Sequence, residues 1–179
     1  MHITTRKLAA AAVTGAAYAA LTMLLAPISY GAIQCRVSEV LCILPFFIPC
    51  TAWGLFAGCA IANLLSAAGI FDVVFGSLAT LLAALCTAWL GRGRGAQSWV
   101  RCILAAFMPV VFNFVLVGAV LTWSLTDAVF PHLNASFWVF GGQVALGEIA
   151  VLGVLGLPLM RLLPRNPKFR EIIRSYQKE

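Results

Sequence analysis

Long apolar runs without any charged residue constrain this chain more than any other feature. Positions 40 to 71 contain no Asp, Glu, Lys or Arg over 32 residues, and positions 8 to 26 are equally free of charge. Only 10% of the residues are charged and 62% are hydrophobic, whereas a soluble domain carries about 25% charged residues. Because so few charges cannot cover a globule with polar surface, we exclude a soluble enzyme, a disordered tail and a nucleic-acid-binding protein. We expect an integral membrane protein.

Apolar length and proline positions predict an all-α bundle of six transmembrane helices. A helix over positions 40–71 would rise about 48 Å, but the hydrocarbon core of a bilayer is only about 30 Å thick. The run must therefore turn back, and we place the turn at Pro45–Pro49 because proline removes a backbone donor and restricts the residue before it. The predicted spans are 8–26, 37–47, 51–66, 73–91, 102–122 and 136–160. Residues 1–164 then form the transmembrane domain and residues 165–179 form a tail.

The tail is predicted to form a cytoplasmic amphipathic helix. Asn166 can cap a helix and Pro167 suits its first position. Apolar side chains then repeat at i, i+3, i+4 and i+7: Phe169, Ile172, Ile173 and Tyr176. This face suits the inner leaflet or a partner protein, and a solubilising tail without a partner is the competing interpretation.

Positive charges predict the orientation. With six spans, every Lys and Arg except Arg36 falls on one side of the membrane, and the positive-inside rule makes that side cytoplasmic. Both termini are therefore expected in the cytoplasm, with segment 28–34 outside and segment 91–96 inside. If the chain does not turn back at Pro45–Pro49, only five spans remain and the basic residues would lie on both sides of the membrane.

Acidic residues within the apolar region mark the candidate binding site. Glu148 lies about halfway through the last predicted span, where an ionisable group is costly and a functional role is the default expectation. It would need a buried partner such as Gln143 or Asn113. At the outer mouth we expect three further acids: Glu39, Asp72 and Asp127. Together these acids would form an outward-facing cavity for a cationic or donor-rich solute.

Several of these polar residues also have a purely structural interpretation. Asp72 opens a span, so its carboxylate can cap a helix N-terminus. Arg36 can pair with Glu39, three residues away. Asn113 follows Pro109 by one turn, so its amide can satisfy the carbonyl that the proline leaves free. The sequence leaves these alternatives open.

Motifs for metal binding and catalysis are missing. The six cysteines form no CxxC pair and only two histidines are present, so we expect neither a metal site nor a cofactor. The sequence also lacks Walker A, GxSxG and HExxH motifs. An intramembrane enzyme using Glu148 and Glu39 as acid and base is a weaker alternative, and a passive channel is another.

The segment ISYGAIQCRVSEVL, residues 28–41, resembles the signature that follows the first helix in the QueT family. Members of this family are substrate-binding subunits (S components) of energy-coupling factor transporters for queuosine precursors. The resemblance continues in order through residues 54–64, 72–81, 112–113, 147–148 and 156–159. It runs from about Ala16 to Met160, and it departs at Ala32, where proline is expected, and at Cys35, where an aromatic residue is expected.

The resemblance implies a non-enzymatic S component in a bacterial cell membrane. Such a subunit pairs with a membrane scaffold subunit and two ABC ATPases, and it is thought to topple in the bilayer to release its load. Its substrate would be a 7-deazaguanine base, such as queuine or its aminomethyl precursor. An S component for another vitamin or purine-like solute is the alternative. The stripe Ala12, Ala16 and Ala20 is similar to the alanine motif by which S components meet the scaffold.

The same resemblance implies that these polar residues bind the substrate. We expect Glu148 or Glu39 to accept the paired N–H donors on one edge of the base, because a carboxylate can accept both. Five residues would shape the cavity: Gln34, Arg36, Asn63, Asp72 and Asn113. Trp123, Phe137 and Trp138 flank the outer loop and could stack on the flat base, and Trp138 is included in the predicted site. An interfacial aromatic belt is the competing interpretation for all three, and it is the preferred one for Trp123.

Overall fold

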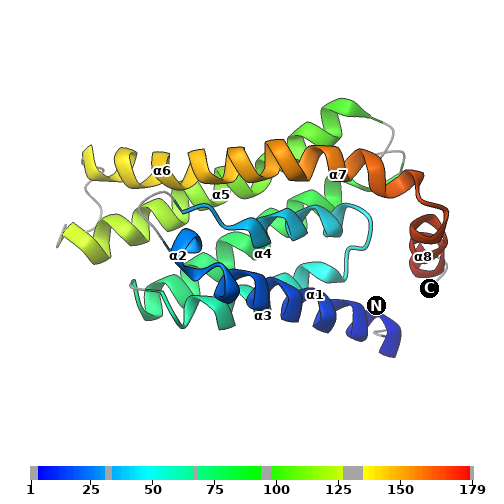
Figure 1. Cartoon of the computed structure of the whole chain (residues 1–179), viewed down its shortest axis with the longest axis horizontal. Helices are drawn as coiled ribbons and strands as arrows, with labels where there is room; N and C mark the ends of the chain where they lie inside the picture. The colour runs from blue at the N-terminus through cyan, green and yellow to red at the C-terminus, as the bar shows by residue number, and fades with distance from the viewer. Residues whose placement is uncertain (1–3, 31–33, 67, 94–97, 127–134, 178–179) are drawn as a thin grey trace.

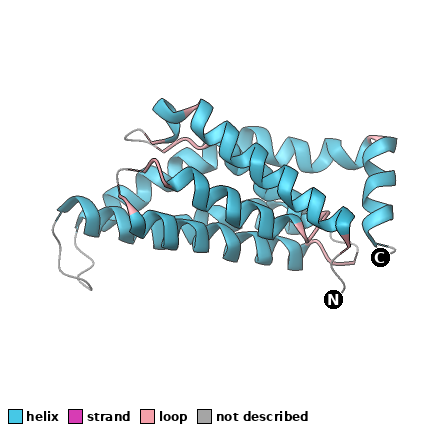
Figure 2. Cartoon of the chain, turned by 90° about the horizontal axis from the view of Figure 1, so that it is seen from below, coloured by secondary structure: helices cyan, strands magenta, loops and turns pink. Residues whose placement is uncertain are grey.

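All regular structure in the described part of the chain is helical. The computed structural model describes residues 4–30, 34–66, 68–93, 98–126 and 135–177, and it confirms the all-α prediction for them. In chain order the elements are α1 (Thr5–Leu24), α2 (Ala26–Ser29), η1 (Val37–Phe46), α3 (Thr51–Asn63), η2 (Asp72–Gly76), α4 (Ser77–Leu90), α5 (Trp99–Thr126), α6 (Ala135–Val151), η4 (Leu152–Gly156), α7 (Leu157–Leu162), η5 (Leu163–Arg165) and α8 (Pro167–Gln177). The long elements lie side by side along one axis, and both termini lie at the same end of the bundle (Figures 1 and 2).

Within the described residues, four segments are long and apolar enough to cross a membrane. They are Thr5–Leu24, Asp72–Leu90, Trp99–Thr126 and Ala135–Arg165. The predicted spans at 37–47 and 51–66 are helical but short, with 10 residues in η1 and 13 in α3. At about 2.0 Å per residue for a 3₁₀-helix and about 1.5 Å for an α-helix, each rises about 20 Å. The count of six spans therefore stays a prediction.

The short helix η1 occupies the centre of the bundle. It contacts α1, α3, α4, α5 and α6, and it is a 3₁₀-helix over all ten residues, although 3₁₀ runs longer than three or four residues are uncommon. Because a 3₁₀-helix has three residues per turn, side chains at i and i+3 eclipse one another. Glu39 and Cys42 are spaced in this way, so the local conformation brings a carboxylate and a thiol together on one face.

Glycines join α1 and α3 at close range. A Cβ built on Gly54 would overlap the carbonyl oxygen of Ala11, and one built on Gly58 would overlap that of Gly15. Small residues four apart allow such backbone approach between membrane helices. The close contact therefore uses Ala11, Gly15, Gly54 and Gly58, whereas the stripe Ala12, Ala16 and Ala20 is exposed.

The tail helix α8 crosses the end of the bundle at which the termini lie (Figures 1 and 2). Asn166 accepts a hydrogen bond from the Lys168 backbone N–H at 3.0 Å, as a capping residue does. The ring of Phe169 lies 5.5 Å from that of Phe47, and the Tyr176 hydroxyl donates to the Arg6 carbonyl at 3.3 Å. The predicted amphipathic helix is confirmed, and part of its apolar face packs on this chain's own bundle.

Candidate functional site

Polar side chains gather inside this apolar bundle. We call the following nine the central polar cluster: Tyr18, Arg36, Glu39, Cys59, Asn63, Asp72, Thr80, Asn113 and Glu148. Each is at most 5% exposed. Because burying a polar group without a hydrogen bond is costly, a cluster of this size needs internal partners, a ligand, or both.

Glu39 is held from two helices. The Tyr18 hydroxyl of α1 donates to Oε1 at 2.5 Å, and the Cys42 thiol, one 3₁₀ turn further along η1, donates to Oε2 at 3.0 Å. Both carboxylate oxygens therefore have a partner within the chain. This arrangement fixes the orientation of Glu39 and gives it a structural role that links η1 to α1.

Arg36 and Asp72 form an ion pair inside the bundle. Arg36 Nη2 lies 3.4 Å from Asp72 Oδ2, with the two side chains 6% and 0% exposed. The guanidinium also lies 5.5 Å from the centre of the Tyr30 ring. The alternative pairing of Arg36 with Glu39 is not formed as a direct contact, because the oxygens of Glu39 accept from Tyr18 and Cys42.

Asn63 and Gly76 set the position of Asp72. The Asn63 amide donates to the Asp72 backbone carbonyl at 2.9 Å and to Cys59 Sγ at 3.5 Å. A Cβ on Gly76 would lie 2.6 Å from both the Asn63 amide nitrogen and Asp72 Oδ1, so glycine leaves the space that these side chains fill. Asp72 begins the π-helical turn η2 and is buried within the bundle; it is not the N-cap, so the capping interpretation is wrong.

Glu148 lies in the middle of the segment α6 to α7, where it is 2% exposed. The Asn113 amide of α5 donates to its Oε1, so of the two buried partners considered, Gln143 and Asn113, the structure shows Asn113. α6, which carries Glu148, contacts η1, which carries Glu39, so Glu148 belongs to the same buried region. One residue before it, Gly147 leaves room for the Gln34 carbonyl, which a Cβ would overlap. The backbone that carries buried Gln34 therefore lies against α6 beside Glu148.

Four atoms of the cluster are buried without a hydrogen-bond partner among the described residues. They are one donor, Arg36 Nε, and three acceptors: Asn63 Oδ1, Asp72 Oδ1 and Glu148 Oε2. More than nine in ten buried polar groups are normally paired. Four unpaired atoms on neighbouring side chains therefore indicate a missing set of partners, chiefly donors.

The structure places most of the predicted site residues inside the bundle. Gln34, Arg36, Glu39, Asn63, Asp72, Asn113 and Glu148 are all buried. Glu39 and Asp72 are both 0% exposed, so protein atoms cover them; their expected place near the outer end of the bundle stays a prediction. Asp127 lies outside the described residues. Trp138 is not part of the cluster: it is 61% exposed and its ring lies 5.9 Å from that of Phe114.

Tyr18 and Cys42 were not predicted as members of this network, whereas Thr80 was expected on the helical face that carries Asp72. The Thr80 hydroxyl donates to Cys59 Sγ at 3.2 Å, and Tyr18 and Cys42 hold Glu39. One signal was available in α1, where Thr14, Tyr18 and Thr22 recur every four residues in an otherwise apolar helix and all three are buried. A polar stripe on a membrane helix indicates a face turned to the bundle interior.

Comparison with known proteins gives a consistent picture. Residues 8–165 match the family model described as the QueT transporter. The queuosine precursor transporter QueT of Lactococcus lactis subsp. cremoris (strain MG1363) is 33% identical over 144 residues, which cover 79% of this chain and 82% of that protein. None of the solved structures matches the chain. The resemblance around residues 28–41 is thus confirmed over nearly the whole length, and the chain belongs to the QueT transporter family.

Proposed function

We propose that this chain is the substrate-binding subunit of an energy-coupling factor transporter and binds a queuosine precursor, a 7-deazaguanine base. The family assignment supports a membrane transporter, and its relative is named for a queuosine precursor. The observation that carries the substrate assignment is the set of unpaired atoms in the central polar cluster, with three acceptors and one donor.

The chemistry of the base fits this set. One edge of a 7-deazaguanine carries an amide N–H and an exocyclic amine, both donors, next to a carbonyl acceptor. Glu148 Oε2, Asp72 Oδ1 and Asn63 Oδ1 can accept from donors of this kind, and Arg36 Nε can donate to the carbonyl. The cluster holds three carboxyl groups and one guanidinium, so the alkylammonium group of some precursors would meet favourable charge.

A ligand panel tests the substrate. Purified protein without partner subunits is melted with queuine, its aminomethyl precursor, guanine, riboflavin and thiamine. A ligand at one hundred times its Kd stabilises the folded state by about 2.7 kcal/mol, so the two deazaguanines should raise the melting temperature. Stabilisation by riboflavin or thiamine alone would support the S component for another vitamin. Turnover of any ligand by the isolated protein would support an intramembrane enzyme.

We also propose six membrane passes with both termini in the cytoplasm. The basic residues of α1, α5, α7 and α8 lie towards the end of the bundle at which both termini lie (Figure 1), and the positive-inside rule assigns that end to the cytoplasm. In this arrangement η1 and α3 are short spans packed inside or against longer helices, where they need not match the bilayer thickness alone.

Thiol labelling in intact cells tests the orientation. Cys35, Cys50 and Cys86, which are half-buried, are replaced by serine, while the three buried native thiols are kept. An impermeant maleimide should then label Ile28→Cys from outside, and should label Arg92→Cys only after permeabilisation, because both positions are exposed at opposite ends of the bundle. If Arg92→Cys is labelled from outside in intact cells, the orientation is the reverse of the one proposed.

The exposed stripe Ala12, Ala16 and Ala20 is proposed as the surface that meets the scaffold subunit, which carries the two ATPases. All three positions are exposed on α1, so a bulky side chain there should leave the central polar cluster untouched. Ala16→Trp should bind substrate with unchanged Kd but reduce ATP-dependent uptake to background. Val115→Trp, at a position 49% exposed on α5, is the matched control and should transport normally. If Ala16→Trp forms an intact complex and takes up substrate normally, the stripe does not contact the scaffold and faces lipid instead.

A further inference from the structure

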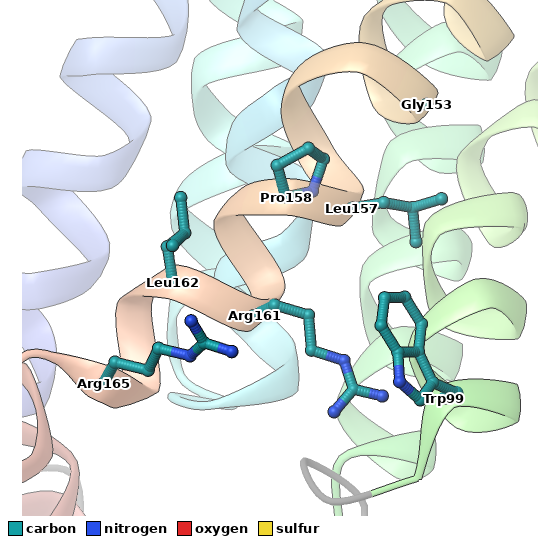
Figure 3. A pocket seen from close by; sticks show the side chains of 7 residues that line it. All are labelled: Trp99, Gly153, Leu157, Pro158, Arg161, Leu162 and Arg165. Carbon is teal, nitrogen blue, oxygen red and sulfur yellow. The ribbon is translucent and has the colours of Figure 1, made fainter.

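A second polar feature lies at the basic end of the bundle, away from the central polar cluster. A groove of about 450 Å³ runs between the start of α5 and the helical run from η4 to η5 (Figure 3). Its walls include Trp99, Leu157, Pro158, Arg161, Leu162 and Arg165. None of the residues that line it is acidic, so its charge is wholly positive.

Arg161 is held in an unusual state in this groove. Its guanidinium carbon lies 3.8 Å from the centre of the Trp99 ring (Figure 3), within the range of a cation–π contact. Its Nε and Nη2 atoms are buried and have no hydrogen-bond partner among the described residues. A guanidinium that has lost part of its hydration without gaining an acceptor is costly. The groove is therefore incomplete without an anion.

The walls of the groove indicate which kind of anion it takes. Trp99 is 60% exposed and Leu162 is 54% exposed, so an apolar surface adjoins the two arginines. A free inorganic anion would leave this surface uncovered, whereas a phospholipid would place its phosphate on the arginines and an acyl chain along the apolar wall. Arginine is well suited to phosphate because its donors form a planar fork.

We propose that this groove binds the headgroup of an anionic phospholipid from the leaflet at the basic end of the bundle. Arg161 and Arg165 hold the phosphate, and Trp99, Leu157 and Leu162 contact the first part of the lipid chain. An anionic leaflet attracts basic residues near its surface, and here the attraction is concentrated at one preformed site. The site is independent of the substrate that the central polar cluster binds.

The experiment measures lipid retention by native mass spectrometry. Purified protein is equilibrated with equal amounts of phosphatidylglycerol and phosphatidylcholine. The wild type should retain one phosphatidylglycerol, with an affinity at least about tenfold above that for phosphatidylcholine. Arg161→Gln should lose about tenfold or more in phosphatidylglycerol affinity, as expected for a lost charge-assisted contact. Lys168→Gln is the matched control, because it removes one exposed charge near the same end without lining the groove, and it should bind as the wild type does.

Three results would overturn the proposal. Equal retention of the two lipids would remove the anion preference, and an equal loss in Lys168→Gln would show a diffuse charge effect. Displacement of the lipid by millimolar inorganic phosphate would assign the groove to a free anion. If Arg161→Gln does not fold, the exposed Arg165→Gln replaces it, with an expected loss of about threefold to tenfold. No loss in that variant would contradict the proposal equally.

Discussion

Replacing Glu148 by glutamine is expected to weaken binding of a 7-deazaguanine base by about ten- to hundredfold, because a charge-assisted hydrogen bond contributes about 1.5–3 kcal/mol. Asn113 donates to Oε1, which leaves Oε2 as the unpaired acceptor. In the variant the amide oxygen would keep the contact with Asn113, so the amide NH₂ would replace Oε2 and present a donor to a donor. Titration calorimetry on purified protein measures the loss.

A second ligand separates recognition by Glu148 from a structural effect. The analogue lacks the exocyclic amine but keeps the remainder of the base. If Glu148 accepts from that amine, the wild type should prefer the full base and Glu148→Gln should lose most of this preference. Equal losses for both ligands would indicate a structural role, and no loss for either would move the assignment to Asp72 Oδ1, another unpaired acceptor. Glu171→Gln, an exposed carboxyl on α8, is the control for removing an acidic charge and should bind normally.

The helices could be predicted largely from where charges and prolines interrupt the apolar sequence. The spans predicted at 73–91 and 102–122 match the segments Asp72–Leu90 and Trp99–Thr126 within a few residues, and the tail begins at its predicted cap, Asn166. The conformation of η1 could not be predicted. Its segment is apolar and contains Pro45, which suits a short span of any helical type. η1 packs against five neighbouring helices, and these contacts cannot be predicted from its local sequence.

Which residues form the site could be predicted better than which of them contact one another. Rare polar residues in an apolar chain are conspicuous, so Arg36, Asp72 and Glu148 stand out without a structure. Their partners depend on which helices touch. Arg36 reaches Asp72 across 36 positions of the chain, whereas spacing alone favoured the nearer Glu39. Tyr18 was missed because its contact with Glu39 requires α1 to lie close against its neighbours, and glycines on another helix make that possible.

Because the contact between Tyr18 and Glu39 depends on close packing of α1 on α3, the second substitution with a large expected effect is at Gly54. Gly54→Ala is expected to lower the free energy of unfolding by about 1–3 kcal/mol or more, the usual cost of overpacking a well-packed interior. The added Cβ would overlap the backbone carbonyl of Ala11, and backbone cannot rotate away as a side chain does. Each kcal/mol lowers the melting temperature of a chain this long by about 2–4 °C, which thermal unfolding in one detergent measures.

The same substitution should also weaken substrate binding, because α1 carries Tyr18. If α1 moves away from α3, the Tyr18 hydroxyl shifts relative to Glu39 Oε1 and Cys59 Sγ, which it contacts at 2.5 and 3.7 Å. The matched control is Gly142→Ala on α6, where a new Cβ would have nothing within 4 Å; it should melt and bind as the wild type does. If Gly54→Ala matches this control in both measurements, close packing of α1 on α3 does not hold the binding site together. Loss of stability with unchanged affinity would separate the helix contact from the position of Tyr18.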